Sequence, residues 1–262
     1  DSADLSSPAG EHVVGVTRIA AWRWHALDDD QVVGRGEVSQ RPDGRPFLSI
    51  DAWHDATFDR LAEAMLPDLP RQPYTVVDEA DLDLLLRWER VGFAPRRREW
   101  EYVVPTDPRI TGLGWAPVPR GVTILAPGQA QAGPLWALDR VLREEIEATV
   151  GWPEMPAEVL SGPDGHLDQS RRRAPWRRAL VNTWDCSAWR HFRGNPDGLI
   201  AVRSDQRRRG IARALLAAVL TSAHRRGIAS MSAEVNINRA AIALFQGVGA
   251  RRTGSSLELV LR

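Results

Sequence analysis

An internal repeat is the feature that most constrains the fold of this chain. Gly92 and Gly249 lie 157 positions apart, and so do Glu101 and Glu258, which aligns "WERVGF…EWEYVV" with "FQGVGA…SLELVL". Further upstream, "FLSI" aligns with "LIAV" at a separation of 152 positions. A repeat of this length indicates a duplicated domain, because the units of solenoid proteins are much shorter.

The two copies differ by five residues, and the difference falls between these landmarks. The second copy has "RSDQRRRG" (203–210) where the first has "DAWHD" (51–55). The second copy therefore carries a loop that the first copy lacks.

Both copies alternate short apolar runs typical of strands with segments of helical periodicity. For the first copy we expect three strands within 20–53, a strand at 74–79, a strand at 99–105, and helices at 55–69 and 81–92. For the second we expect strands at 121–127, 179–185, 198–202, 230–235 and 257–262, and helices at 134–150, 210–226 and 238–249. This order predicts an α/β (α+β) fold of two tandem domains, 1–108 and 121–262, joined by a Pro- and Gly-rich linker at 109–120. Each domain is expected to have a mixed central sheet flanked by helices.

Composition excludes several classes of function. All 34 basic residues are arginine, whereas a Walker-type phosphate loop, a kinase phosphate site and a pyridoxal Schiff base all require lysine. Cys186 is the only cysteine, which excludes an internal disulfide and a cysteine-cluster zinc site and fits a reducing compartment. We therefore expect no metal.

Charge and hydropathy predict a cytoplasmic protein. The formal net charge is zero, which argues against a broadly electrostatic partnership with nucleic acid or a membrane. No apolar run approaches the ~18 residues of a membrane span. The first residues also lack the basic-then-apolar order of a secretion signal.

The stretch "GLIAVRSDQRRRGIARALL" carries the strongest chemical signal. It predicts a strand, a tight loop with Gly210, and a helix that begins at Ile211. Free N–H groups and the helix dipole favour an anion at such a helix start, and glycine lets a ligand approach the backbone closely. The run Arg207–Arg209 could add charge-assisted contacts, so the segment predicts a pyrophosphate cradle. The competing interpretation is a solvated arginine run or a nucleic-acid patch.

This segment resembles the acetyl-CoA loop of the GNAT N-acetyltransferase superfamily. The family pattern Arg/Gln-x-x-Gly-x-Gly/Ala is matched by Arg207, Gly210 and Ala212. A later family pattern, Asn-x-x-Ala-x-x-Leu-Tyr-x-x-x-Gly-Phe, is matched at Asn238, Ala241, Leu244 and Gly249, with departures at Phe245 and Ala250. The resemblance covers about 198–262.

The resemblance implies which residues bind acetyl-CoA. In the family, pantetheine pairs with the strand before the loop and a backbone N–H there holds the thioester carbonyl, which implies roles for Ile200, Ala201 and Val202. The pyrophosphate would lie on the loop and helix start. The residues implied there, and by the second motif, are Arg207, Arg208, Arg209, Gly210, Ile211, Ala212, Arg213, Asn238 and Phe245. Asn238 is equally suited to cap a helix.

The chemistry implied is direct attack of a neutral amine on the thioester, which needs a base and benefits from an acid. Glu234 resembles the glutamate of the ribosomal-protein alanine acetyltransferases and is the candidate base; the alternative is an ordinary surface residue of a strand. The family's usual acid is the tyrosine at the position of Phe245, and both tyrosines of this chain, Tyr74 and Tyr102, lie in the first copy. Either the thiolate leaves unaided, water or another group supplies the proton, or no acetyl transfer occurs.

The first copy is expected to be degenerate. Its "DAWHDATFDR" has neither the glycine nor the arginine of the cradle, so we expect one active site, as in similar tandem GNAT proteins such as the mycothiol synthases. The predicted function is transfer of acetyl from acetyl-CoA to a primary amine of a small molecule or peptide, by a monomer or homodimer. The alternatives are an inactive CoA-binding regulatory or structural protein and an arginine-mediated nucleic-acid binder. Trp176, Trp184 and Trp189 are candidates for lining the acceptor pocket.

Overall fold

The computed structural model describes residues 14–41, 44–69, 72–115, 117–125, 131–151, 154–155, 180–182, 187–191, 198–236 and 238–262. Its strands are β1 (Gly15–Ala20), β2 (Arg23–Asp28), β3 (Gln31–Gln40), β4 (Pro46–Ala52), β5 (Tyr74–Asp78), β6 (Phe93–Pro105), β7 (Thr123–Leu125), β8 (Leu180–Asn182), β9 (Ser187–His191), β10 (Gly198–Val202), β11 (Ser230–Asn236) and β12 (Arg251–Leu261). Its helices are α1 (Asp55–Met65), α2 (Leu82–Arg90), α3 (Pro108–Thr111), α4 (Ala132–Thr149), α5 (Ile211–Arg225) and α6 (Arg239–Gln246), with short 3-10 turns η1 (Leu66–Asp68), η2 (Leu113–Trp115) and η6 (Ser204–Gln206).

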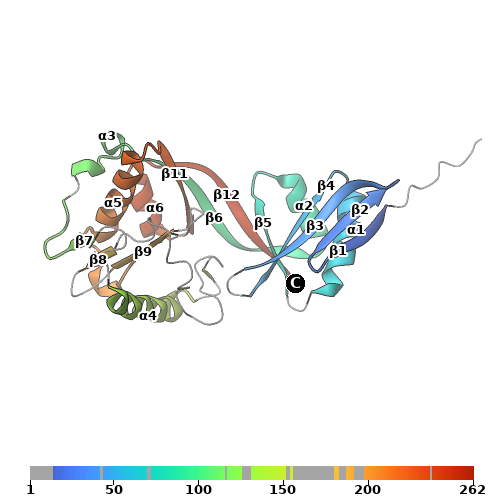
Figure 1. The fold of residues 1–262 in the computed structure, drawn as a ribbon, viewed down its shortest axis with the longest axis horizontal. Coiled ribbons are helices and arrows are strands. Elements are labelled where there is room, and N and C mark those ends of the chain that lie inside the picture. Colours follow the sequence, from blue (N-terminus) through green and yellow to red (C-terminus); the bar gives the residue numbers. More distant parts are fainter. Residues whose placement is uncertain are drawn as a thin grey trace, which may run out of the picture.

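Two lobes are joined by the long strands β6 and β12, which run side by side across the middle of the molecule (Figure 1). An eight-stranded sheet has the order β1-β2-β3-β4-β5-β12-β6-β11, and a four-stranded sheet has the order β10-β9-β8-β7. Helices α1 and α2 belong to the first lobe, and α4, α5 and α6 to the second (Figure 1).

The last strand of each copy is placed among strands of the other copy. β12 lies between β5 and β6, and β6 lies between β12 and β11. The eight-stranded sheet therefore crosses the predicted boundary between 1–108 and 121–262. That division stays a prediction, since the two lobes share strands.

The strand register follows the sequence repeat. Glu258 is opposite Arg97, and the residues that the repeat relates to these two, Glu101 and Gly254, are also opposite each other. β6 and β12 are antiparallel neighbours. The two copies are therefore related by a pseudo-two-fold axis that passes between these strands.

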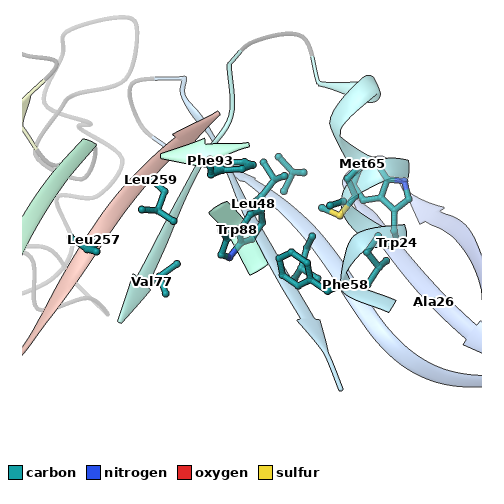
Figure 2. Close-up of a cluster of buried hydrophobic side chains, with 14 residues drawn as sticks. Trp24, Ala26, Leu48, Phe58, Met65, Val77, Trp88, Phe93, Leu257 and Leu259 are labelled. Carbon is teal, nitrogen blue, oxygen red and sulfur yellow. The ribbon is translucent and has the colours of Figure 1, made fainter. Parts of the chain in front are cut away.

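The core of the first lobe forms where α1 and α2 pack on the sheet (Figure 2). Trp88 of α2 makes edge-to-face contacts with Phe58 of α1 and with Phe93, at centroid distances of 5.0 and 4.7 Å. Met65, the last residue of α1, is also fully buried. The helix predicted for 55–69 is confirmed up to this residue, after which it gives way to the turn η1.

The core of the second lobe forms under α5. Leu215, Leu216 and Leu220 of this helix are buried. The segment expected to be a linker also contributes, because α3 and η2 pack against α5 and Leu113 is 3% exposed in the same cluster as Leu216. The connection between the lobes is therefore part of the second core.

Candidate functional site

The predicted cradle is a strand, a loop and a helix, with the loop turned by two residues of positive φ. β10 leads through η6 to Arg208, at φ 66°, and Gly210, at φ 82°. Gly210 is the N-cap of α5, and within the described part of the chain no side chain caps this helix. The first N–H groups of α5 are therefore left for another acceptor, and the helix dipole favours an anion.

Two of the cradle arginines are held by the loop itself. Arg207 donates from Nε to the carbonyl oxygen of Val202, at 3.1 Å. Arg209 donates to the side-chain oxygen of Gln206 and, at 3.4 Å, to the carbonyl oxygen of Arg120. Arg208 and Arg213 are exposed. Arg207 and Arg209 thus fix the loop conformation.

Glu145 of α4 attaches the loop to the rest of the lobe. Its carboxylate accepts hydrogen bonds from the Ser204 backbone N–H at 2.9 Å and hydroxyl at 3.0 Å. One carboxylate oxygen also lies 3.5 Å from Arg207 Nη2. Sequence reasoning did not single out Glu145, because a glutamate within a helix of ordinary periodicity gives no local sign of a distant partner.

β10 and β11 border the same core without pairing. β10 ends the four-stranded sheet and β11 ends the eight-stranded one, and among the described strands neither has a second neighbour. Ile200 of β10 nevertheless packs against the cluster that contains Met231 and Ala233 of β11. An edge strand presents unpaired N–H and C=O groups, so an extended ligand can pair here as an added strand.

The residues predicted along this edge are only partly buried. Ala201 and Val202 lie at the end of β10, next to the loop. Ile211 is different: its side chain is 2% exposed and packs against Leu215. Only the backbone of Ile211 is suited to ligand contact.

Asn238 caps α6. Its side-chain oxygen accepts hydrogen bonds from the backbone N–H groups of Ala240, at 2.9 Å, and Ala241, at 3.4 Å. The capping role expected for this residue is therefore present. It leaves the side-chain amide group, which donates, for other contacts.

Glu234 lies on the exposed side of β11. Its neighbour Val235 is 3% exposed and faces the core, so Glu234 points to the opposite face. Directly across from it on β6 is Glu101, a residue of the first copy. Two carboxylates in register repel each other unless a positive charge is near them.

Of the three tryptophans predicted to line an acceptor pocket, one lies within the described residues. Trp176 and Trp184 lie outside the described residues, as does Cys186. Trp189 belongs to β9, opposite Ile200 of β10.

In the first lobe, side chains of that lobe fill the region that corresponds to the cradle and the edge of β10. The Thr75 hydroxyl of β5 donates to the carbonyl oxygen of Leu48 on β4, at 2.9 Å, and Arg87 donates to the carbonyl oxygen of Ala52, at 3.1 Å. Asp55, at the start of α1, is 2.8 Å from Arg87 and 3.0 Å from Arg90. The hydrogen bond from Arg90 lowers the pKa of Asp55 below its ordinary value, assisted by the charge of Arg87.

A family model matches the second lobe. Residues 189–250 match the model described as "Acetyltransferase (GNAT) family". This range includes β10, the cradle, α5, β11 and α6. No curated protein matches the chain in sequence.

Solved structures with similar folds include several described as GNAT proteins. A tandem GNAT protein from the clavulanic acid biosynthesis pathway aligns with a TM-score of 0.63 at 14% identity, over 91% of this chain and 81% of that one. A GCN5-related N-acetyltransferase from Sphaerobacter thermophilus aligns with a TM-score of 0.61 at 19% identity, over 93% and 81%. A GCN5-related N-acetyltransferase from Kribbella flavida aligns with a TM-score of 0.52 at 14% identity, over 94% and 89%.

These likenesses confirm the predicted GNAT resemblance and the α/β fold with mixed sheet and flanking helices. The family match covers residues 189–250 of the second lobe, and the fold of the tandem GNAT protein is similar to the duplicated arrangement seen here. Among the helices that the structure describes, none is both long and apolar enough to cross a membrane.

Proposed function

We propose that this chain is an N-acetyltransferase that transfers the acetyl group of acetyl-CoA to a primary amine, with a single cofactor site in the second lobe. The observation that carries the proposal is the cradle of β10 and α5 beside the edges of β10 and β11, which have no second neighbour among the described strands. The family match supports it, because residues 189–250 include all of these elements.

Each part of the cofactor has a matching part of the site. The uncapped start of α5 and the exposed Arg208 suit a pyrophosphate, since both present positive charge to an anion. The free edge of β10 suits the two amides of pantetheine, which would pair with Ile200–Val202 as an added strand. A backbone N–H of this edge would then stabilise the oxyanion that develops on the thioester carbonyl.

The acceptor side is proposed to involve Glu234. Its carboxylate takes a proton from the attacking ammonium group, so that a neutral amine reaches the carbonyl carbon. Glu101, directly opposite on β6, adds a second negative charge that favours a cationic acceptor. The proposed acceptor is an amine of a small molecule or peptide. The protein is proposed to act in the cytoplasm as a monomer or homodimer. It is proposed to need no metal and to bind neither nucleic acid nor a membrane.

The direct test is calorimetric titration of the full chain with acetyl-CoA. Gly210→Asp places a carboxylate at the pyrophosphate position and should weaken binding by about 100-fold or more, equivalent to the ~2.7 kcal/mol of two tenfold steps. Gly227→Asp is the matched control, because Gly227 also has positive φ, 77° against 82°, but lies at the other end of α5. Binding that survives in Gly210→Asp, or is lost equally in both variants, contradicts the site.

A second candidate is a protein that binds CoA without turnover, and Phe245 favours it. The family's usual acid is a tyrosine at this position. Tight acetyl-CoA binding without CoA thiol release in the presence of any primary amine would support this candidate over the enzyme.

A further inference from the structure

Tyr102 is a buried residue of the first copy that the structure places against Phe245 of the second. It lies on β6, is 2% exposed, and its ring stacks on that of Phe245 with a centroid distance of 6.0 Å and an interplanar angle of 23°. Its cross-strand partner on β11 is Ala233, the residue before Glu234. The exchanged strand thus brings a phenol to the helix position where the tyrosine is missing.

The hydroxyl of Tyr102 has no other evident use. Within the described part of the chain it makes no hydrogen bond, and its oxygen is not one of the fully buried polar atoms that lack a partner. The cluster next to Phe245 is built from apolar side chains, among them Val104, Leu216 and Val248. The ring stack with Phe245 places the Tyr102 phenol beside this cluster.

The fold itself does not require a tyrosine here. The repeat relates Tyr102 to Leu259, which is opposite Thr75 just as Tyr102 is opposite Ala233. Leu259 is fully buried and fills its position in the first lobe with an aliphatic side chain alone. The hydroxyl of Tyr102 is therefore an addition that packing does not explain.

We propose that Tyr102 donates the proton to the departing thiolate of CoA, so that the first lobe completes the active site of the second. This inference rests on the proposed acetyl transfer. The amine nitrogen forms a bond to the thioester carbon, the carbon–sulfur bond breaks with its electron pair on sulfur, and the Tyr102 hydroxyl proton passes to that sulfur. Glu234 takes the proton lost by the amine, and solvent returns a proton to the phenolate.

The test compares three variants of the full chain in two measurements. Acetyl-CoA affinity is measured by calorimetry, and turnover by release of the CoA thiol with glycinamide, an amine that is about half uncharged near pH 8. Tyr102→Phe keeps the stacked ring and removes only the hydroxyl. It should lower kcat by about 100-fold or more and leave acetyl-CoA affinity within about twofold. Tyr74→Phe is the control, since Tyr74 is also stacked, on Phe47 at 5.5 Å, and should behave like the parent.

The double variant Tyr102→Phe, Phe245→Tyr separates a proton donor from a structural residue. It places the hydroxyl on the ring at position 245 of α6 in place of the ring at position 102 of β6. This variant should recover at least a tenth of the parent kcat.

The outcomes distinguish this inference from the function on which it rests. If the parent turns over and Tyr102→Phe does so at the same rate, Tyr102 is not the donor and acetyl transfer stands. If the parent binds acetyl-CoA but releases no thiol with glycinamide or other primary amines, the proposed transfer fails and the inference falls with it.

Discussion

The two lobes each begin a helix after their fourth strand, and these two helix starts are built in opposite ways. α1 begins with Asp55, whose carboxylate is held by Arg87 and Arg90. α5 begins after Gly210, and its first turn has no acidic residue. The first lobe supplies its own anion to the helix start, whereas the start of α5 has no acidic residue in its first turn and no side-chain cap among the described residues.

The strands beside these helices also differ in whether a side-chain hydroxyl satisfies a strand carbonyl. In the first lobe the Thr75 hydroxyl satisfies the carbonyl of Leu48. The repeat relates these residues to Ala233 and Ile200, so the second lobe has no side-chain hydroxyl at the corresponding point. The first lobe thus satisfies with its own side chain the carbonyl that corresponds to that of Ile200 on the proposed pantetheine edge.

The largest expected effect concerns two glutamates that the repeat relates. The Glu258 side chain is 3% exposed and is paired with Arg45, Arg96 and Arg97. Glu258→Gln should lower the free energy of unfolding by about 3–5 kcal/mol, because removing one partner leaves buried charges uncompensated. Denaturant unfolding measures this.

Glu101→Gln is the matched control for that prediction. Glu101 occupies the repeat-related position but is exposed, so its replacement should change stability by no more than about 0.5 kcal/mol. Equal effects of the two substitutions would show that the buried ionic cluster does not distinguish the lobes.

The next effect tests whether acetyl-CoA binding depends on the lack of a side-chain hydroxyl at position 233 of β11. Ala233→Thr places on β11 the hydroxyl that Thr75 has on β5. It should raise the Kd for acetyl-CoA about tenfold, or ~1.4 kcal/mol, by competing for the carbonyl of Ile200. Ser232→Thr, on the other face of β11, should leave the Kd within about twofold in the same titration.

The reverse change should destabilise the first lobe without giving it a cofactor site. Thr75→Ala leaves the buried carbonyl of Leu48 unsatisfied and should cost about 1–3 kcal/mol in denaturant unfolding. Thr253→Ala, which removes an exposed hydroxyl that donates to the Glu101 carbonyl, should cost much less. Calorimetric stoichiometry should stay at one acetyl-CoA per chain, and a second bound equivalent would show that Thr75 alone closes the first lobe.

The smallest effect concerns the pH dependence of the Asp55 cluster. Because Arg90 lowers the pKa of Asp55, the folded state gains stability above the ordinary Asp pKa and loses it as the pH falls through the lowered one. Asp55→Asn should therefore melt slightly below the parent at pH 7 and together with it in strong acid. A melting difference that is independent of pH would contradict this origin.

Sequence reasoning predicted the elements with strong local patterns and missed those that depend on distant partners. Helix α5 and the cap of α6 at Asn238 follow local rules, and the structure has both. β6 begins at Phe93, before the predicted strand, because Arg96 and Arg97 look solvated until Glu258 of β12 is placed beside them.

The predicted site was incomplete for the same reason. The proposed cradle lies within one local segment and was predicted from its glycine and arginine pattern. Glu145, Glu101 and Tyr102 reach the site from α4 and from the first copy, through contacts 59 or more positions apart in the chain. No periodicity within a window of a few turns contains that information.

The exchange of β6 and β12 gives the chain the geometry of a homodimer fused into one polypeptide. Two copies that trade their final strands about a two-fold axis form the closed, self-complementary contact of a symmetric dimer. Fusion removes the need for the halves to find each other in solution and allows each to change alone. One protomer of such an ancestor could then lose its ligand while remaining indispensable as the source of its partner's strand.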